Sequence, residues 1–221
     1  MNKLPFFEAV LFDMDGTLVD SEPIWLESEI ELMDRFGYLW TSKDQAFCLG
    51  GPLNRVGDYM NQLAGNTKDA DYFVTELVNL MVAKMEAGAG LMNGALEILS
   101  FVRDQGAKTA LVSASPRKLM DAVLKSITPV SFELTISSDD VQYPKPSPES
   151  YIKAAQYLGV HPKNCLVLED SLTGVQSAVE SGAYVIALPH LVAIKESERV
   201  KVFHSLSDLT PEVLLSLRTH W

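Results

Sequence analysis

From residue 93 onward, short apolar segments typical of buried strands alternate with amphipathic segments typical of helices. This order predicts strands at residues 108–113, 132–137, 165–168 and 184–188, with a weaker edge strand at 200–203. Alternating strands and helices build a mostly parallel sheet with right-handed crossovers and helices on its faces. We therefore expect an α/β fold, with a Rossmann-like, three-layer core.

One predicted strand stands apart from this series, near the start of the chain. Residues 9–12 (AVLF) form an apolar run, whereas residues 20–87 that follow show only helical patterns. The first of these helices carries Leu26, Ile30, Met33 and Phe36 at helical spacing. The simplest arrangement is a core domain, residues 1–19 and 89–221, with an inserted α-helical cap domain, residues 20–88. The two connections between the domains suit hinge motion.

The composition excludes several classes of protein. The chain has 221 residues, of which 47% are hydrophobic and 21% charged, as in ordinary globular proteins. Its net charge of −11 argues against binding nucleic acid or an anionic membrane through bulk charge. No apolar run approaches ~20 residues, so we expect no transmembrane helix. The chain has only two cysteines, Cys48 and Cys165, far apart in sequence, which fits the reducing cytoplasm. As a default we expect a monomer.

Polar side chains follow four of the predicted strands at the points where the strands end. Ligands of open parallel sheets bind beyond these carboxyl ends. Each group alone has an ordinary structural explanation, such as capping the next helix or lying in an exposed loop. Together they combine carboxylates, hydroxyls and a cation, which suits a hard divalent cation and a phosphoryl group. In chain order the residues are Asp13, Asp15, Ser113, Ser115, Lys145, Glu169 and Asp170.

The same segments resemble, in order and spacing, the four motifs of the haloacid dehalogenase superfamily. They are residues 13–17 (DMDGT), 112–115 (VSAS), 145–148 (KPSP) and 168–174 (LEDSLTG). The helical insertion resembles the C1 cap of the subclass that includes phosphoglycolate phosphatase, β-phosphoglucomutase and the hexose-phosphate phosphatases. The resemblance spans residues 8–190. The chain departs from the family pattern at two places. Pro144 stands where a glycine usually precedes the motif lysine, and residues 93–94 are Asn-Gly where Pro-Gly is usual.

The resemblance implies a Mg²⁺-dependent phosphatase that works through an aspartyl-phosphate. Asp13 would be the nucleophile, and Asp15 would protonate the leaving alcohol and later activate water. Mg²⁺ would be bound by Asp13, the backbone carbonyl of Asp15 and Asp170, with Glu169 acting nearby or through water. The phosphoryl group would be bound by Ser113, the Ala114 N–H and Lys145, and Lys145 would also restrain Asp13.

Asp15 and the cap favour one activity among several alternatives. Dehalogenases proper lack the second aspartate of the first motif, and ATPase relatives commonly carry threonine there. β-Phosphoglucomutase has a histidine where this chain has Trp25, and no histidine precedes His161. Residues 20–25 instead resemble the hexose-phosphate phosphatases. We therefore favour hydrolysis of a small phosphorylated metabolite, above all a sugar phosphate, over a phosphomutase or a non-catalytic protein that binds such metabolites.

Four residues of the predicted cap are candidates for substrate contacts: Gly50, Asn54, Arg55 and Trp25. In relatives an arginine just after this glycine reaches the substrate, which suggests the same role for Arg55. The alternative is a plain surface arginine. For Trp25 the alternative is packing between cap helices. The substrate itself does not follow from the sequence.

Overall fold

The protein is seen here in a computed structural model that describes residues 6–189 and 192–220. A six-stranded sheet in the order β3-β2-β1-β4-β5-β6 forms its centre, and every neighbouring pair of strands is parallel. The predicted strands are confirmed, including the weak one at the edge, although the one expected at 132–137 is shorter. The strands are β1 (Ala9–Phe12), β2 (Lys108–Val112), β3 (Leu134–Ile136), β4 (Cys165–Glu169), β5 (Tyr184–Ala187) and β6 (Val200–Val202).

Helices cover both faces of the sheet, because side chains along each strand point alternately to opposite sides. In β1, Val10 and Phe12 pack into the apolar cluster shared with α5 (Ala95–Asp104), α6 (Arg117–Ser126) and α9 (Pro211–His220). Ala9 and Leu11 pack on the other face with α7 (Glu149–Leu158) and α8 (Leu172–Ser181). The predicted three-layer α/β core is therefore confirmed. Short 3₁₀ turns, η1 (Ser138–Asp140), η2 (Pro162–Asn164) and η3 (Leu206–Asp208), complete the connections.

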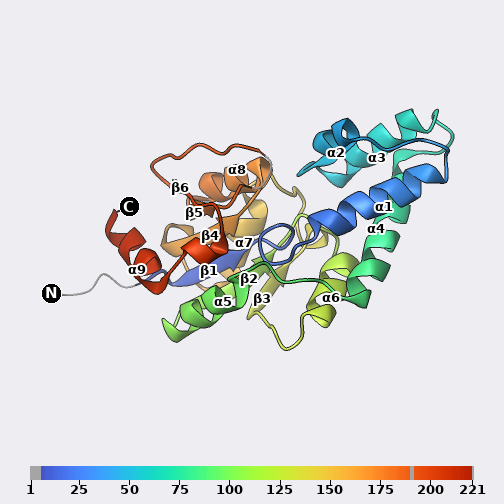
Figure 1. The fold of residues 1–221 in the computed structure, drawn as a ribbon. Coiled ribbons are helices and arrows are strands. Elements are labelled where there is room, and N and C mark those ends of the chain that lie inside the picture. The colour runs from blue at the N-terminus through green and yellow to red at the C-terminus, as the bar shows by residue number, and fades with distance from the viewer. Residues whose placement is uncertain (1–5, 190–191, 221) are drawn as a thin grey trace.

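Four helices lie together beside the sheet, and we call them the cap helices (Figure 1). They have an apolar cluster of their own, and α4 also packs against α6 of the core. At the junction, Asp20 N–H donates to the Gly90 carbonyl and Met92 N–H to the Leu18 carbonyl, both at 2.9 Å. The division into residues 1–19 with 89–221 and 20–88 stays a prediction that this arrangement supports. The cap helices are α1 (Glu22–Asp34), α2 (Ser42–Cys48), α3 (Leu53–Leu63) and α4 (Ala70–Ala87).

The apolar stripe expected on the first cap helix is partly wrong. Ile30 is 46% exposed, whereas Glu29, Leu32 and Met33 are buried. The reason is that α1 has two neighbours: it packs against α4 and also borders a cavity that faces the sheet. A single stripe read from spacing cannot show a face divided in this way, so it wrongly included Ile30, whereas Leu26, Met33 and Phe36 do pack in the cap.

The structure also bears on the expectations drawn from composition. Both Cys48 and Cys165 are buried, and neither forms a disulfide bond. In the described part of the chain, no helix combines the length and apolar content that crossing a membrane requires. The cytoplasmic location, the monomeric state and the lack of binding to nucleic acid stay predictions.

The packing of the cap helices gives a first testable prediction. Phe73 of α4 is fully buried among them, with its ring centroid 5.0 Å from that of Phe36. Because Phe73→Ala leaves a cavity there, we expect it to lower the free energy of unfolding by about 3–5 kcal/mol in urea titrations. Leu39→Ala is the control, since Leu39 is 85% exposed. Equal, small effects of the two substitutions would contradict a cap with its own packed core.

Candidate active site

The register of the three central strands brings the motif residues to one edge of the sheet. Phe12 pairs with Leu111 of β2 and with Leu168 of β4, so the residues after these strands lie side by side. A cavity of about 310 Å³ opens at this edge, between the strand ends and the cap helices. Small-molecule sites span roughly 300–1,000 Å³, so this cavity suits a small ligand. Its lining includes Asp13, Asp15, Ser113, Ala114, Lys145, Glu169 and Asp170.

Lys145 is buried among hydrogen-bond acceptors from three strands. Its Nζ donates to Asp13 Oδ1 at 2.6 Å, Glu169 Oε1 at 2.7 Å and the Val112 carbonyl at 2.9 Å. It also lies 4.8 Å from the centroid of the Tyr151 ring. Burial alone would lower the pKa of Lys145, but the charges of Asp13 and Glu169 outweigh burial and raise it well above its ordinary value. Lys145 is therefore a fixed positive charge against Asp13.

Glu169 differs from its acidic neighbours because donors of the protein occupy both of its oxygens. Beside Lys145, Oε1 accepts from the Tyr151 hydroxyl at 3.1 Å. The other oxygen, Oε2, accepts from the Ser171 N–H at 2.9 Å and hydroxyl at 3.0 Å. A Cβ at Gly174 would lie 1.6 Å from Oε1, so only glycine fits beside this carboxylate. Glu169 is thus held as part of the framework, which leaves it little capacity to bind a ligand directly.

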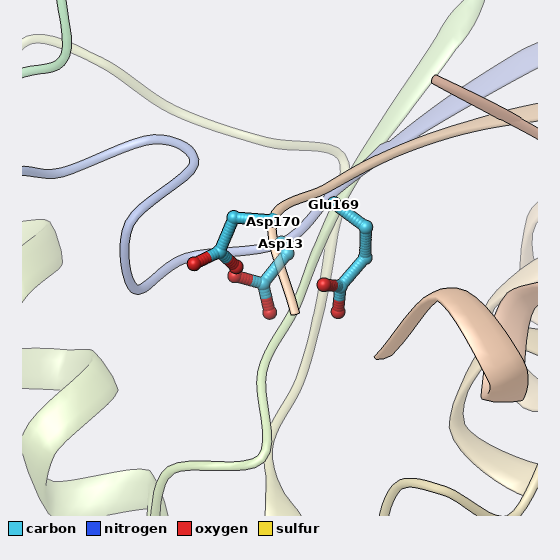
Figure 2. Close-up of side chains that lie close together, drawn as sticks. All are labelled: Asp13, Glu169 and Asp170. Atoms are coloured by element: carbon cyan, nitrogen blue, oxygen red, sulfur yellow. The ribbon is translucent and has the colours of Figure 1, made fainter. Parts of the chain in front are cut away.

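Asp13 and Asp170 present carboxylates that are less fully paired. Figure 2 shows their side chains together, with Glu169 beside them. Ligand oxygens of the three residues lie within 4.8 Å of one another, and no hydrogen bond from the described part of the chain reaches the Asp170 carboxylate. Burial, and then the charges of Glu169 and Asp13, raise the pKa of Asp170 well above its usual range. Burial also raises the pKa of Asp13 well above its ordinary value, although the positive charge of Lys145 acts to lower it.

The net charge of these side chains indicates whether a divalent cation fits the site. Three carboxylates face one lysine, so full ionisation would leave two negative charges in excess. Buried like charges of this kind are costly unless they are compensated, and carboxylate oxygens are the ligands that Mg²⁺ prefers. The donor set and its charge therefore fit Mg²⁺, with Asp13 and Asp170 as the available carboxylates.

Asp15 is held by donors from both the cap and the core. The indole Nε1 of Trp25, on α1, donates to Oδ1 at 3.2 Å. The hydroxyls of Ser115 and Ser113 donate to Oδ2 at 2.8 and 3.3 Å. Neither serine makes a side-chain capping bond to α6, so the capping alternative does not apply, and both hydroxyls point to Asp15 instead. The Ala114 N–H has no backbone acceptor among the described residues, and Ala114 lines the cavity.

The loop between α2 and α3 closes the cavity from the cap side. The Gly50 carbonyl accepts a hydrogen bond from the Thr173 hydroxyl at 3.2 Å, which joins this loop to the start of α8. Arg55 borders the cavity, but its Nη2 donates to the Phe47 carbonyl at 2.8 Å and its guanidinium lies over the Phe47 ring. Asn54 does not line the cavity, and its side chain accepts from the Arg55 N–H.

One face of α1 supplies two acidic residues that the sequence did not single out. Glu22, Trp25, Leu26 and Glu29 all line the cavity, because residues three, four and seven apart share a helix face. Glu29 is only 6% exposed, and its Oε2 accepts from the Trp40 indole at 3.1 Å. Burial raises the pKa of Glu29 to about 8 and that of Glu22 to about 7. The spacing of 22, 25 and 29 was the available signal.

Comparisons with known proteins agree with this geometry. A family model described as haloacid dehalogenase-like hydrolase matches residues 10–188. The chain belongs to this family. Hexitol phosphatase B of Escherichia coli (strain K12) is 31% identical over 206 residues, which cover 91% of this chain and 92% of that protein. The phosphorylated carbohydrates phosphatase of Thermotoga maritima is 30% identical over 177 residues, 79% of this chain and 82% of its own.

Solved structures of the family share the fold. A haloacid dehalogenase hydrolase of family IA, variant 3, from Entamoeba histolytica has a TM-score of 0.84 at 23% identity. The match covers 96% of this chain and 99% of that one. The predicted family is confirmed, and the phosphatase names of the curated relatives support the prediction that this hydrolase is a phosphatase.

The environment of Glu29 predicts how the stability of this hydrolase depends on pH. Its pKa is about 8 in the folded protein against an ordinary 4.5, and Glu22 and Asp44 add to the effect of burial. Between these values the folded protein holds a proton that the unfolded chain has released, so stability falls as the pH rises. The free energy of unfolding should fall between pH 5 and 8 in both proteins, but the fall should be smaller in Glu29→Gln than in wild type. We expect a difference of about 1–3 kcal/mol between the two falls in urea titrations.

The matched control for this measurement is Glu27→Gln. Glu27 lies on the same helix, and its side chain is 68% exposed. Its carboxylate pairs with Lys84 at 3.0 Å at the surface, where ion pairs contribute little to stability, so Glu27→Gln should keep the wild-type pH profile. Parallel pH profiles for wild type and Glu29→Gln would show that Glu29 is not buried as the structure has it.

Proposed function

We propose that this chain is a Mg²⁺-dependent phosphomonoester hydrolase that acts on a small phosphorylated metabolite, above all a sugar phosphate. The observation that carries the proposal is the pair of carboxylates of Asp13, which is buried, and Asp170, which is partly buried, beside Lys145 at the core end of a cavity of small-molecule size. Two curated relatives, named for hexitol phosphate and phosphorylated carbohydrate hydrolysis, support this class of substrate.

Asp13 would be the nucleophile. Lys145 holds its Oδ1, which leaves Oδ2 to attack phosphorus. A bond forms between Oδ2 and phosphorus while the bond from phosphorus to the leaving oxygen breaks, which gives an aspartyl-phosphate. Water then attacks phosphorus, and phosphate and the free Asp13 carboxylate are released. The Ser113 hydroxyl and the Ala114 N–H, which both border the cavity, would bind the phosphoryl oxygens.

Asp15 would handle the proton in both steps. It donates to the leaving alcohol in the first step and takes a proton from the attacking water in the second. Its carboxyl is fixed by Trp25 on one oxygen and by Ser115 on the other. Because Trp25 belongs to the cap and Ser115 to the core, this contact would orient Asp15 only when the two parts are together.

Mg²⁺ would be held by Asp13, the backbone carbonyl of Asp15 and Asp170. Glu169 would act indirectly, since its oxygens already accept four hydrogen bonds from the protein. When bound, the ion would neutralise the charge between the phosphoryl group and the carboxylates.

The nucleophile and the metal can be tested with p-nitrophenyl phosphate. Wild type with Mg²⁺ should release phosphate, and EDTA should abolish the release until Mg²⁺ is restored. Asp13→Asn should lower kcat by at least about 1,000-fold, because the amide cannot form the acyl phosphate. Equal release by wild type and Asp13→Asn would rule out this nucleophile. Glucose 1-phosphate converted to glucose 6-phosphate with little free phosphate would establish a mutase, and no turnover at all would favour a binding protein.

Trp25→Phe tests whether the indole N–H orients Asp15, because this variant keeps a ring but loses the donor. We expect kcat/KM for glucitol 6-phosphate, which reports the first phosphoryl transfer, to fall by about 10- to 100-fold, since its alkoxide needs a proton in order to leave. For p-nitrophenyl phosphate, whose leaving group departs without a proton, the loss in kcat/KM should stay below about threefold. Equal losses on both substrates would mean that Trp25 supports only the packing of the cap.

A further inference from the structure

The cavity has two ends of different chemistry. The core end holds the groups that the proposed phosphoryl transfer uses, from Asp13 to Asp170. The cap end is lined by the α1 face and by neighbouring cap helices, with Glu22, Glu29 and Gln45 as polar groups among Leu26 and Leu77. The proposed reaction gives these polar groups no task, although Glu29 is buried and Glu22 and Gln45 are half-buried, which is costly without hydrogen bonds.

Glu29 is the most enclosed polar group of the cap end. One oxygen, Oε2, accepts from Trp40, and no hydrogen bond from the described residues reaches the other oxygen. Its position follows from the helix: Glu29 is four residues after Trp25, which is about 6 Å along the axis. Trp25 touches Asp15, so Glu29 lies one turn deeper, where the carbon chain of a bound phosphate ester would extend.

The charges at the cap end restrict what this carbon chain can carry. None of the ion pairs of the described residues includes Glu29 or Glu22. Arg55 is the one cation among the described cap residues that line the cavity, and its guanidinium is bound to the Phe47 carbonyl and stacked on the Phe47 ring. Carboxyl groups without a cation pair well with neutral hydroxyls and poorly with a second anionic group.

We infer that Glu29, with Glu22 on the same face of α1, determines specificity by binding the hydroxyl groups of the substrate's carbon chain. The substrates are then polyol or sugar monophosphates, rather than alkyl phosphates or compounds with a second anionic end. The inference rests on the proposed phosphatase activity. It gives the cap end of the same cavity the task of binding the substrate's carbon chain.

Three substrates of equal chain length test this assignment: glucitol 6-phosphate, hexyl phosphate and 6-phosphogluconate. The first carries hydroxyls, the second lacks them, and the third has a carboxylate at the far end. For wild type with Mg²⁺, kcat/KM should be about 100-fold lower for hexyl phosphate, because the site's buried polar groups are left unpaired. It should be about 10-fold lower for 6-phosphogluconate, because of the second negative charge.

Two substitutions of Glu29 then test whether this residue causes the preference for glucitol 6-phosphate. Glu29→Leu should lower kcat/KM for glucitol 6-phosphate by about 30-fold while that for hexyl phosphate changes less than threefold. Glu29→Gln keeps part of the hydrogen bonding and should show a loss of about 5-fold on glucitol 6-phosphate alone. Glu27→Gln, on the exposed side of α1, should match wild type on all three. Urea unfolding of each variant confirms that it is folded.

The outcomes separate this inference from the proposed function. A wild type that hydrolyses hexyl phosphate as efficiently as glucitol 6-phosphate overturns the inference but leaves the phosphatase in place. Equal losses on glucitol 6-phosphate and hexyl phosphate in folded Glu29→Gln also overturn it, since Glu29 would then serve only the packing of the cap. No hydrolysis of these substrates or of p-nitrophenyl phosphate by wild type overturns the proposed function, and the inference with it.

Discussion

The buried ammonium of Lys145 is the interaction on which the rest of the site depends. It joins the end of β1, the last carbonyl of β2 and the end of β4 through three short hydrogen bonds. An uncompensated carboxylate at any of these points would be costly in so dry an environment. The surroundings of the lysine are correspondingly fixed: Tyr151 holds Glu169 from α7, and position 174 has no room for a Cβ. One cation thus sets the positions of two carboxylates from neighbouring strands.

What Lys145 leaves uncompensated explains why the site can hold a metal. Asp13 and Asp170 remain close together with little pairing of their own, and Gly16 allows this approach. A Cβ there would lie 2.4 Å from Asp170 Oδ2, and its φ of 75° favours glycine. A fold optimised for stability alone would separate or pair such charges. Carboxylates held close together at a cost in stability are expected at a functional site.

The sequence was sufficient for most of the fold and for the core end of the site. Alternating strands and helices imply a parallel sheet, and parallel strands bring their carboxyl ends to one edge, so residues as distant as Asp13 and Asp170 could be grouped without coordinates. The cap was less accessible. Ile30, which was expected in the apolar stripe, is exposed and the neighbouring Glu29 is buried, because the rotation of α1 about its axis depends on both α4 and the cavity. Arg55 on α3 contacts Phe47 on α2, and no spacing rule predicts such a contact.

The side-chain directions of α1 link the two ends of the cavity. Trp25 and Glu29 are one turn apart on the same face, and a helix is stiff over that length. The first holds Asp15, and the second borders the space for the carbon chain. A hydroxylated chain bound at Glu29 would therefore also fix the helix turn that positions Asp15. An alkyl chain of equal length would fill the same cavity without fixing that turn. Recognition of the hydroxyls and delivery of the proton would then be coupled through one rigid element, with no moving part between them.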